Sequence, residues 1–202
     1  MTYGYGGASY LGPTIEAQRG NPVVFVARNR LGLHPLGIDE ALHGPDTAVD
    51  QLFPRASLHL HGGYTEPGSD GYPEDTFTPG QDHVYRYAND QQAGSTWYHD
   101  HALGITRLNV YAGLAGFYLI RHASVEAGLP SGKFEIPLAI QDKSFISDGG
   151  THQLSYPDPW EPEFFGDVVV VNGRPGRTST SHAGNTGSAS STARAHGSTT
   201  ST

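Results

Sequence analysis

The sequence contains the stretch Thr96-Trp97-Tyr98-His99-Asp100-His101-Ala102 and, before it, His59-Leu60-His61-Gly62-Gly63. In each stretch, two histidines are separated by one residue. Because side chains i and i+2 of an extended strand project to the same face, each pair aims two imidazoles at one point. Imidazole nitrogen binds copper, zinc, iron and nickel, so two converging pairs offer four donors. The sequence therefore predicts a metal site built on β-strands.

Short strands separated by turns are predicted along the rest of the chain. The 27 glycines and 14 prolines, with runs of Val, Thr, Tyr and Phe between them, favour this organisation. The ranges 30–54 and 66–80 are predicted to be loops, and 104–112 a short helical turn. Without long periodic helices, the spacing indicates an all-β sandwich or barrel. Strands are expected at residues 14–18, 23–29, 55–61, 83–87, 96–99, 116–121, 134–143 and 168–171.

Composition excludes several classes of function. The chain has 202 residues, enough for one substantial domain, and a net charge of −8, which argues against a nucleic-acid partner. No apolar run approaches the roughly 20 residues of a membrane helix, and the first residues show no export signal, which leaves the compartment open. Cysteine is absent, so disulfides, thiolate catalysis and copper centres with a cysteine ligand are excluded within these residues.

Composition changes abruptly after Gly173. Residues 174–202 contain no Val, Ile, Leu, Met, Phe, Tyr or Trp and consist mainly of Ser, Thr, Gly and Ala. Such a segment cannot bury enough apolar surface to fold, so it is predicted to be a disordered tail.

Side chains outside the two histidine pairs have simpler interpretations. Single histidines more often form hydrogen bonds than bind metals. Asp100 lies between two candidate ligands, but strand alternation turns it to the other face. Asp70 by itself is a turn residue, and Trp97 and Tyr98 are core or rim aromatics. This interpretation applies to His34, His43, His83, His122 and His152.

Three kinds of metal site fit the pairs. The first is a copper site in a cupredoxin-like sandwich. The second is a cupin barrel, because Glu66 follows the first pair as in half of the first cupin motif. The spaced glycines of that motif are missing, however, and residues 79–83 match the second motif only loosely. The third is a structural zinc site, although such sites usually include cysteine.

The residues around the histidines favour the copper site. Residues 59–63, 69–73, 96–102 and 106–114 resemble the multicopper oxidases, in particular the branch of bacterial spore-coat laccases, bilirubin oxidases and phenoxazinone synthases. The segment Gly12-Pro13-Thr14-Ile15-Glu16 resembles a strand of the same family. The resemblance covers residues 3 to 173.

The resemblance implies a fold and a set of roles. Residues 1–173 would form the first of three cupredoxin domains, a Greek-key β-sandwich that is incomplete at its N-terminus. His59 would bind the type 2 copper, and His61, His99 and His101 the type 3 pair, of a trinuclear cluster. Asp70 would assist proton delivery. Family members oxidise phenols, aminophenols or bilirubin-like substrates at a type 1 copper and reduce dioxygen to water at the cluster.

Part of the family's pattern is missing from this sequence. Four further cluster histidines and a cysteine-containing type 1 site come from a later domain in the family, and neither is present. The chain is therefore expected to be a fragment that supplies half of the cluster ligands, needs the missing cupredoxin domains and is inactive alone. The contrasting interpretation is a non-catalytic copper-binding module.

The tail at residues 174–202 suggests why sequence similar to the family's second domain is missing from this chain. Back-translated and read from the third base of each codon, it permits a stretch similar to the segment that follows Val171-Asn172-Gly173 in this family. We therefore predict that the tail is second-domain coding sequence read out of frame, through a mutation or a sequencing error. Sequencing the gene around codon 173 tests this.

Overall fold

A computed structural model describes residues 1–156 and 163–176 of the chain. The chain divides into two compact units, residues 1–125 and residues from 126 onward. None of the helices in the described part is long and apolar enough to cross a membrane. Residues 177–202, most of the predicted tail, lie outside the described residues. The domain boundary after residue 173 and the frame-shift origin of the tail therefore stay predictions.

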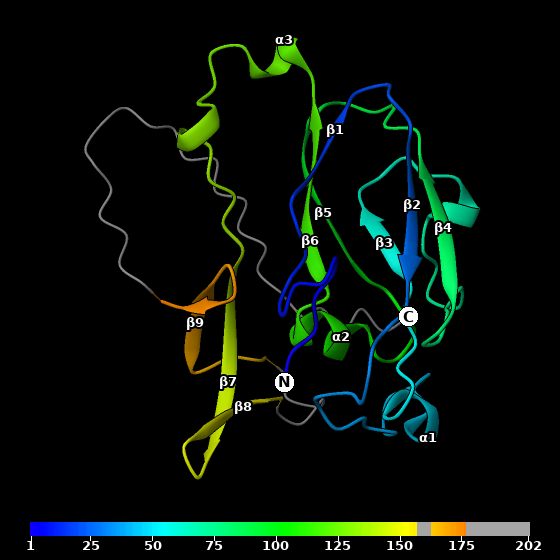
Figure 1. The fold of residues 1–202 in the computed structure, drawn as a ribbon, viewed down its shortest axis with the longest axis vertical. Coiled ribbons are helices and arrows are strands. Elements are labelled where there is room, and N and C mark those ends of the chain that lie inside the picture. Colours follow the sequence, from blue (N-terminus) through cyan, green and yellow to red (C-terminus); the bar gives the residue numbers. More distant parts are fainter. Residues whose placement is uncertain (157–162, 177–202) are drawn as a thin grey trace. The chain divides into compact units, whose positions relative to one another are not determined.

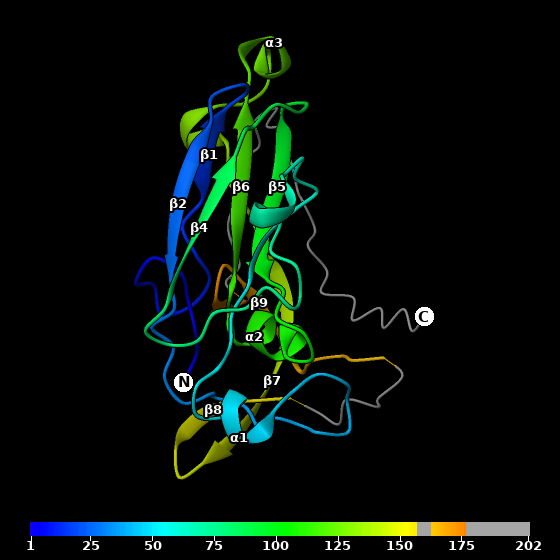
Figure 2. The same cartoon turned by 90° about the vertical axis from the view of Figure 1, so that its right-hand side faces the viewer.

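The first unit contains two facing sheets (Figures 1 and 2). In the smaller sheet, β2 (Val23–Arg28) pairs antiparallel with β4 (Asp82–Tyr87). The larger sheet has the order β1-β6-β5-β3, in which β1 and β6 are parallel and the other neighbours antiparallel. Its strands are β1 (Ile15–Gln18), β6 (Ala115–Arg121), β5 (Gly94–Asp100) and β3 (Leu58–His61).

Helices are short in both units. The longest, α2 (Thr106–Ala112), follows the second histidine pair directly. The helix α1 (Thr47–Asp50) is capped by the side chain of Asp46, which accepts from the Val49 amide. The remaining elements are α3 (Ala123–Glu126) and the 3₁₀ turns Pro67–Ser69 and Gly132–Phe134.

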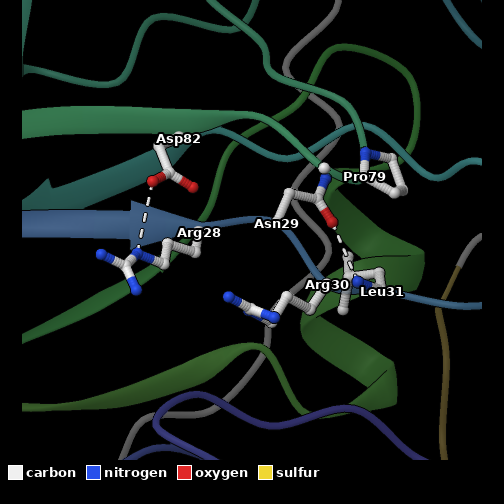
Figure 3. A pocket seen from close by; sticks show the side chains of 7 residues that line it. Arg28, Asn29, Arg30, Leu31, Pro79 and Asp82 are labelled. Atoms are coloured by element: carbon white, nitrogen blue, oxygen red, sulfur yellow. Dashed lines mark hydrogen bonds and ion pairs between the residues drawn. The ribbon is translucent and has the colours of Figure 1, made fainter.

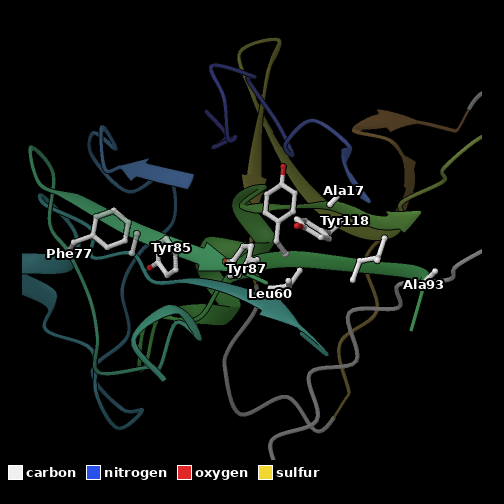
Figure 4. Packing of buried hydrophobic residues seen from close by; sticks show 10 residues of the cluster. Ala17, Leu60, Phe77, Tyr85, Tyr87, Ala93 and Tyr118 are labelled. Carbon is white, nitrogen blue, oxygen red and sulfur yellow. The ribbon is translucent and has the colours of Figure 1, made fainter. Parts of the chain in front are cut away.

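The core of the first unit lies between its two sheets (Figure 4). Leu60 of β3 and Tyr98 of β5 point into it and are 1% and 3% exposed. Tyr85 and Tyr87 enter from β4, and Tyr118 enters from β6. Because strand side chains alternate, burying Leu60 and Tyr98 on this face turns the neighbouring histidines to the opposite face of the larger sheet. Packing of the core thus decides where the imidazoles project.

The second unit holds a four-stranded sheet of order β10-β9-β7-β8. Its longest strand, β7, forms a hairpin with β8 and also pairs antiparallel with β9. The strands are β7 (Ile140–Asp148), β8 (Thr151–Ser155), β9 (Val168–Val171) and β10 (Arg174–Pro175).

Most predicted elements are confirmed, but the strand expected at 134–143 is wrong in its bounds. It begins at Ile140 and continues to Asp148. Phe134 instead ends a 3₁₀ turn, and Pro137 has no amide hydrogen to give to a strand ladder. The following strand, β8, was not predicted, because its polar sequence hides the alternation; Gly149 and Gly150, both at positive φ, form the turn before it.

Candidate metal centre

The pairing of β3 with β5 brings the two histidine pairs together. In the antiparallel register His59 lies opposite His99, and His61 lies opposite Trp97. His101 lies one residue beyond the end of β5, where its backbone amide donates to the Ser57 carbonyl at 2.8 Å. Two strands and the first residue after one of them thus position all four imidazoles.

The imidazole rings are close neighbours. The ring of His99 lies 5.4 Å from that of His59 and 5.3 Å from that of His61, measured between centroids. One nitrogen from each of these three residues can be chosen so that all lie within 4.8 Å of one another. His101 stacks on His59 at 4.8 Å, beside that group of three. The structure therefore brings together the four predicted ligands.

Backbone carbonyls orient three of the four rings. The Nδ1 atoms of His59, His99 and His101 lie 2.5, 2.7 and 3.2 Å from the carbonyl oxygens of Asp70, Asp100 and Gly71. A carbonyl can only accept, so we assign the ring proton to Nδ1, which makes Nε2 the unprotonated nitrogen of each ring. His61 differs, because its Nδ1 lies 3.1 Å from the Nε2 of His99. Nδ1 of His61 and Nε2 of His99 are therefore neighbours inside the cluster.

Burial keeps the imidazoles in the form that binds metals. It is the main reason that the pKa of His99, which is 6% exposed, is lowered to about 3; the bond to the Asp100 carbonyl opposes this shift, and the neighbouring rings add to it. Burial also lowers the pKa of His61 and of His101. At neutral pH these three rings are therefore neutral, and a lone pair is available on each.

The lowered pKa of His99 predicts how the metal-free chain responds to acid. Below about pH 6.5 this ring binds a proton only when the chain unfolds. Acid therefore favours the unfolded state and lowers the free energy of unfolding. Burial raises the pKa of Asp100 to about 7, which acts in the opposite direction.

The test therefore compares the free energies of unfolding of two proteins, the unchanged chain and its His99→Ala variant. Relative to the unchanged chain, His99→Ala should gain up to about 1.4 kcal/mol in unfolding free energy per pH unit of acidification below 6.5. Urea unfolding at stepped pH measures this, and parallel pH profiles would contradict it.

Asp70, for which the family resemblance implies a place near the cluster, lies beside His59. Its carbonyl accepts from His59, and its carboxylate lies 3.8 Å from Nδ1 of the same ring. Thr65 Oγ1 donates to that carboxylate at 2.5 Å, and the Asp70 side chain is 26% exposed. The carboxylate thus reaches both the histidine cluster and solvent.

Trp97 contacts the histidine cluster directly, which the sequence analysis did not predict. Its ring stacks on His99 at 4.2 Å and on His61 at 5.1 Å, with 29° between the planes in both contacts. The signal was present in the sequence, since Trp97 and His99 share a strand face. Trp97 therefore covers one side of the cluster rather than packing into the core.

Four other histidines have contacts outside the two histidine pairs. His34 is buried and contacts Asn109 Oδ1 at 3.1 Å, and the ring of His83 packs at a tilt against that of Tyr85. His122 and His152 contact the hydroxyls of Ser124 and Ser147. Among the described residues, the group of donors suited to a metal consists of His59, His61 and His99.

A separate hollow of about 340 Å³ lies at the far end of β2 (Figure 3). Its lining contains no histidine. Arg28 and Asp82 form an ion pair there at 3.3 Å, with both side chains at least half exposed, so the pair contributes little to stability. Oδ1 of Asn29 accepts a hydrogen bond from the Leu31 amide. The hollow is thus distinct from the histidine cluster.

Comparison with known proteins identifies the family. Residues 48–124 match the family model of the multicopper oxidases. The multicopper oxidase LPR2 of Arabidopsis thaliana is 41% identical over 185 residues, which cover 83% of this chain and 32% of that protein. A laccase of Bacillus stratosphericus is 42% identical over 184 residues, which cover 81% of this chain and 36% of that protein. The chain thus spans about a third of the length of these relatives.

Solved structures agree with the sequence comparison. The McoA multicopper oxidase of Aquifex aeolicus has a TM-score of 0.63 at 28% identity, covering 81% of this chain and 32% of that one. A multicopper oxidase from Pediococcus acidilactici has a TM-score of 0.66 at 25% identity, covering 86% and 32%. These likenesses confirm the cupredoxin-like β-sandwich. By its sequence, its fold and its histidine pairs, the chain belongs to the multicopper oxidase family.

Proposed function

We propose that this chain is the part of a copper-dependent oxidase that supplies half of the ligands to a trinuclear copper cluster. The enzyme would couple oxidation of phenolic or aminophenolic donors to reduction of dioxygen to water. The observation that carries the proposal is the convergence of four imidazoles, three of which have Nδ1 bound to a backbone carbonyl, so that Nε2 is the nitrogen left to bind a metal.

The donor set fits copper. All four donors are imidazole nitrogens, which suit copper, whereas calcium and magnesium prefer oxygen ligands. Burial keeps His61, His99 and His101 neutral, so a metal need not displace a proton from them at neutral pH. The carbonyls that hold the rings reduce the cost of arranging them around an ion.

We assign His59 to the type 2 copper and His61, His99 and His101 to the type 3 pair. Bound copper would supply the one-electron steps that dioxygen reduction requires. The carboxylate of Asp70 has the position needed to pass protons between solvent and the cluster, because it is partly exposed and lies 3.8 Å from His59. Trp97 covers the rings of His61 and His99 and limits access of water from its side.

A copper titration of the full chain, followed by electron paramagnetic resonance, tests the proposal. We expect copper to bind at histidine nitrogen without sustained oxygen consumption when a phenolic dye is added. The family's remaining ligands and type 1 site would have to come from further cupredoxin domains. A folded chain that binds no copper would refute the assignment, and turnover by the chain alone would refute the need for further domains.

A further inference from the structure

We propose that Asp100 is a positioning residue that holds His101 in place for copper binding without touching the metal. The inference rests on the proposed copper function. Asp100 separates two candidate ligands but faces the other side of β5, where it is completely buried. A carboxylate in such a place is costly unless its oxygens are bonded.

Three donors satisfy the two carboxylate oxygens. Oδ2 accepts from the Ser57 amide at 3.0 Å, and Oδ1 accepts from the Ala102 amide at 3.1 Å and from Asn109 Nδ2 at 2.9 Å. These donors come from the residue before β3, from the residue after His101 and from α2. One side chain therefore ties together three segments around the end of β5.

Asn109 extends this network into the interior. It is completely buried, and its Nδ2 also donates to the Arg55 carbonyl at 3.1 Å. Its Oδ1 lies 3.1 Å from Nε2 of the buried His34. Asp100 is thus held by a partner that is itself fixed on two sides.

His101 is the ligand that depends most on this network. The ladder between β3 and β5 ends at the pair Leu58 and Asp100, so strand pairing does not extend to His101. Its amide donates to the Ser57 carbonyl, while the Ser57 amide donates to Asp100. Asp100 also binds Ala102 on the other side of His101. The backbone on both flanks of the ligand is therefore anchored to one carboxylate.

The N–H donors around Asp100 require an acceptor oxygen at both Oδ1 and Oδ2. Asparagine has the same shape but only one acceptor oxygen, and its amide group would face an N–H donor. Asp100→Asn should therefore release Ser57 or Ala102 while changing the packing little. His59, His61 and His99 keep their strand positions in this variant.

The test is a copper titration of the full chain and its Asp100→Asn variant. We expect an affinity about 10-fold or more lower, the range seen when a partner of a metal ligand is removed, and an altered paramagnetic spectrum. The decisive measurement is the coupling between two sites. His101→Ala should cost much less affinity in the Asp100→Asn background than in the unchanged chain, because His101 is already displaced there.

Asn29→Ala is the matched control for a loss of stability alone. Asn29 is 3% exposed and bridges the carbonyls of Pro54 and Phe77, but it has no contact with the histidines. It should lower the melting temperature and leave copper affinity unchanged. If Asp100→Asn does not fold by circular dichroism, Asn109→Ala, which removes one of the three donors, replaces it.

Additive losses with His101→Ala, or an unchanged affinity and spectrum in a folded variant, would overturn the inference. Failure of the unchanged chain to bind copper would instead refute the proposed function. The two failures are therefore distinguishable.

Discussion

Replacing His99 by alanine should abolish high-affinity copper binding while the chain remains folded. His99 is the most enclosed of the four imidazoles, with ring contacts to His59, His61 and His101. Its Nε2 faces His61 Nδ1 at 3.1 Å, so its removal takes away the nitrogen nearest to another donor. Each of the other imidazoles would lose a neighbour at the same time.

The expected loss exceeds the roughly 10- to 100-fold that removal of an outer partner of a ligand costs, because a ligand itself is removed. Competition titration with a copper chelator measures it. His83→Ala is the matched control, since His83 also contacts aromatic rings, those of Tyr85 and Phe77, but lies outside the donor group found among the described residues. Equal affinities of the His99 and His83 variants would contradict the assignment of the site.

Strand alternation was sufficient to predict which side chains share a face. Leu60 and Tyr98 are apolar and alternate with the histidines, so the core side of β3 and β5 could be inferred before any contact was known. The same rule turned Asp100 away from the ligands, and the structure confirms this. The four candidate ligands and the all-β class could be predicted from local sequence pattern and the family resemblance alone.

The contacts that arrange the ligands could not be predicted in this way. The register of β3 against β5 joins residues 40 positions apart, such as His59 and His99, and depends on the packing of the whole sheet. The carbonyls of Asp70 and Gly71 meet the imidazoles through a loop whose path has no periodic signal. The link from Asp100 to Asn109 likewise requires α2 to be placed first.

Gly71→Ala should be among the most destabilising single-methyl additions in the chain. Gly71 has a φ of +74°, and a Cβ there would lie 2.2 Å from the Leu58 carbonyl oxygen and 2.9 Å from the His59 amide nitrogen. Both atoms belong to the backbone of β3, so no side-chain rotation relieves the clash. Left-handed strain of about 1–2 kcal/mol adds to an overpacking cost of about 1–3 kcal/mol.

Gly80→Ala separates the two costs. Gly80 also has a positive φ, +91°, but a Cβ there would meet no atom within 4 Å. Gly80→Ala should therefore lower the free energy of unfolding only by the backbone strain. The difference in unfolding free energy between the two variants, measured with urea, then gives the cost of the clash with β3. Gly71→Ala should also weaken copper binding, because the Gly71 carbonyl holds His101 and the neighbouring Asp70 carbonyl holds His59. Equal destabilisation by the two substitutions would show that the loop shifts to relieve the clash without moving β3. An unchanged copper affinity would show that these carbonyls do not arrange the ligands.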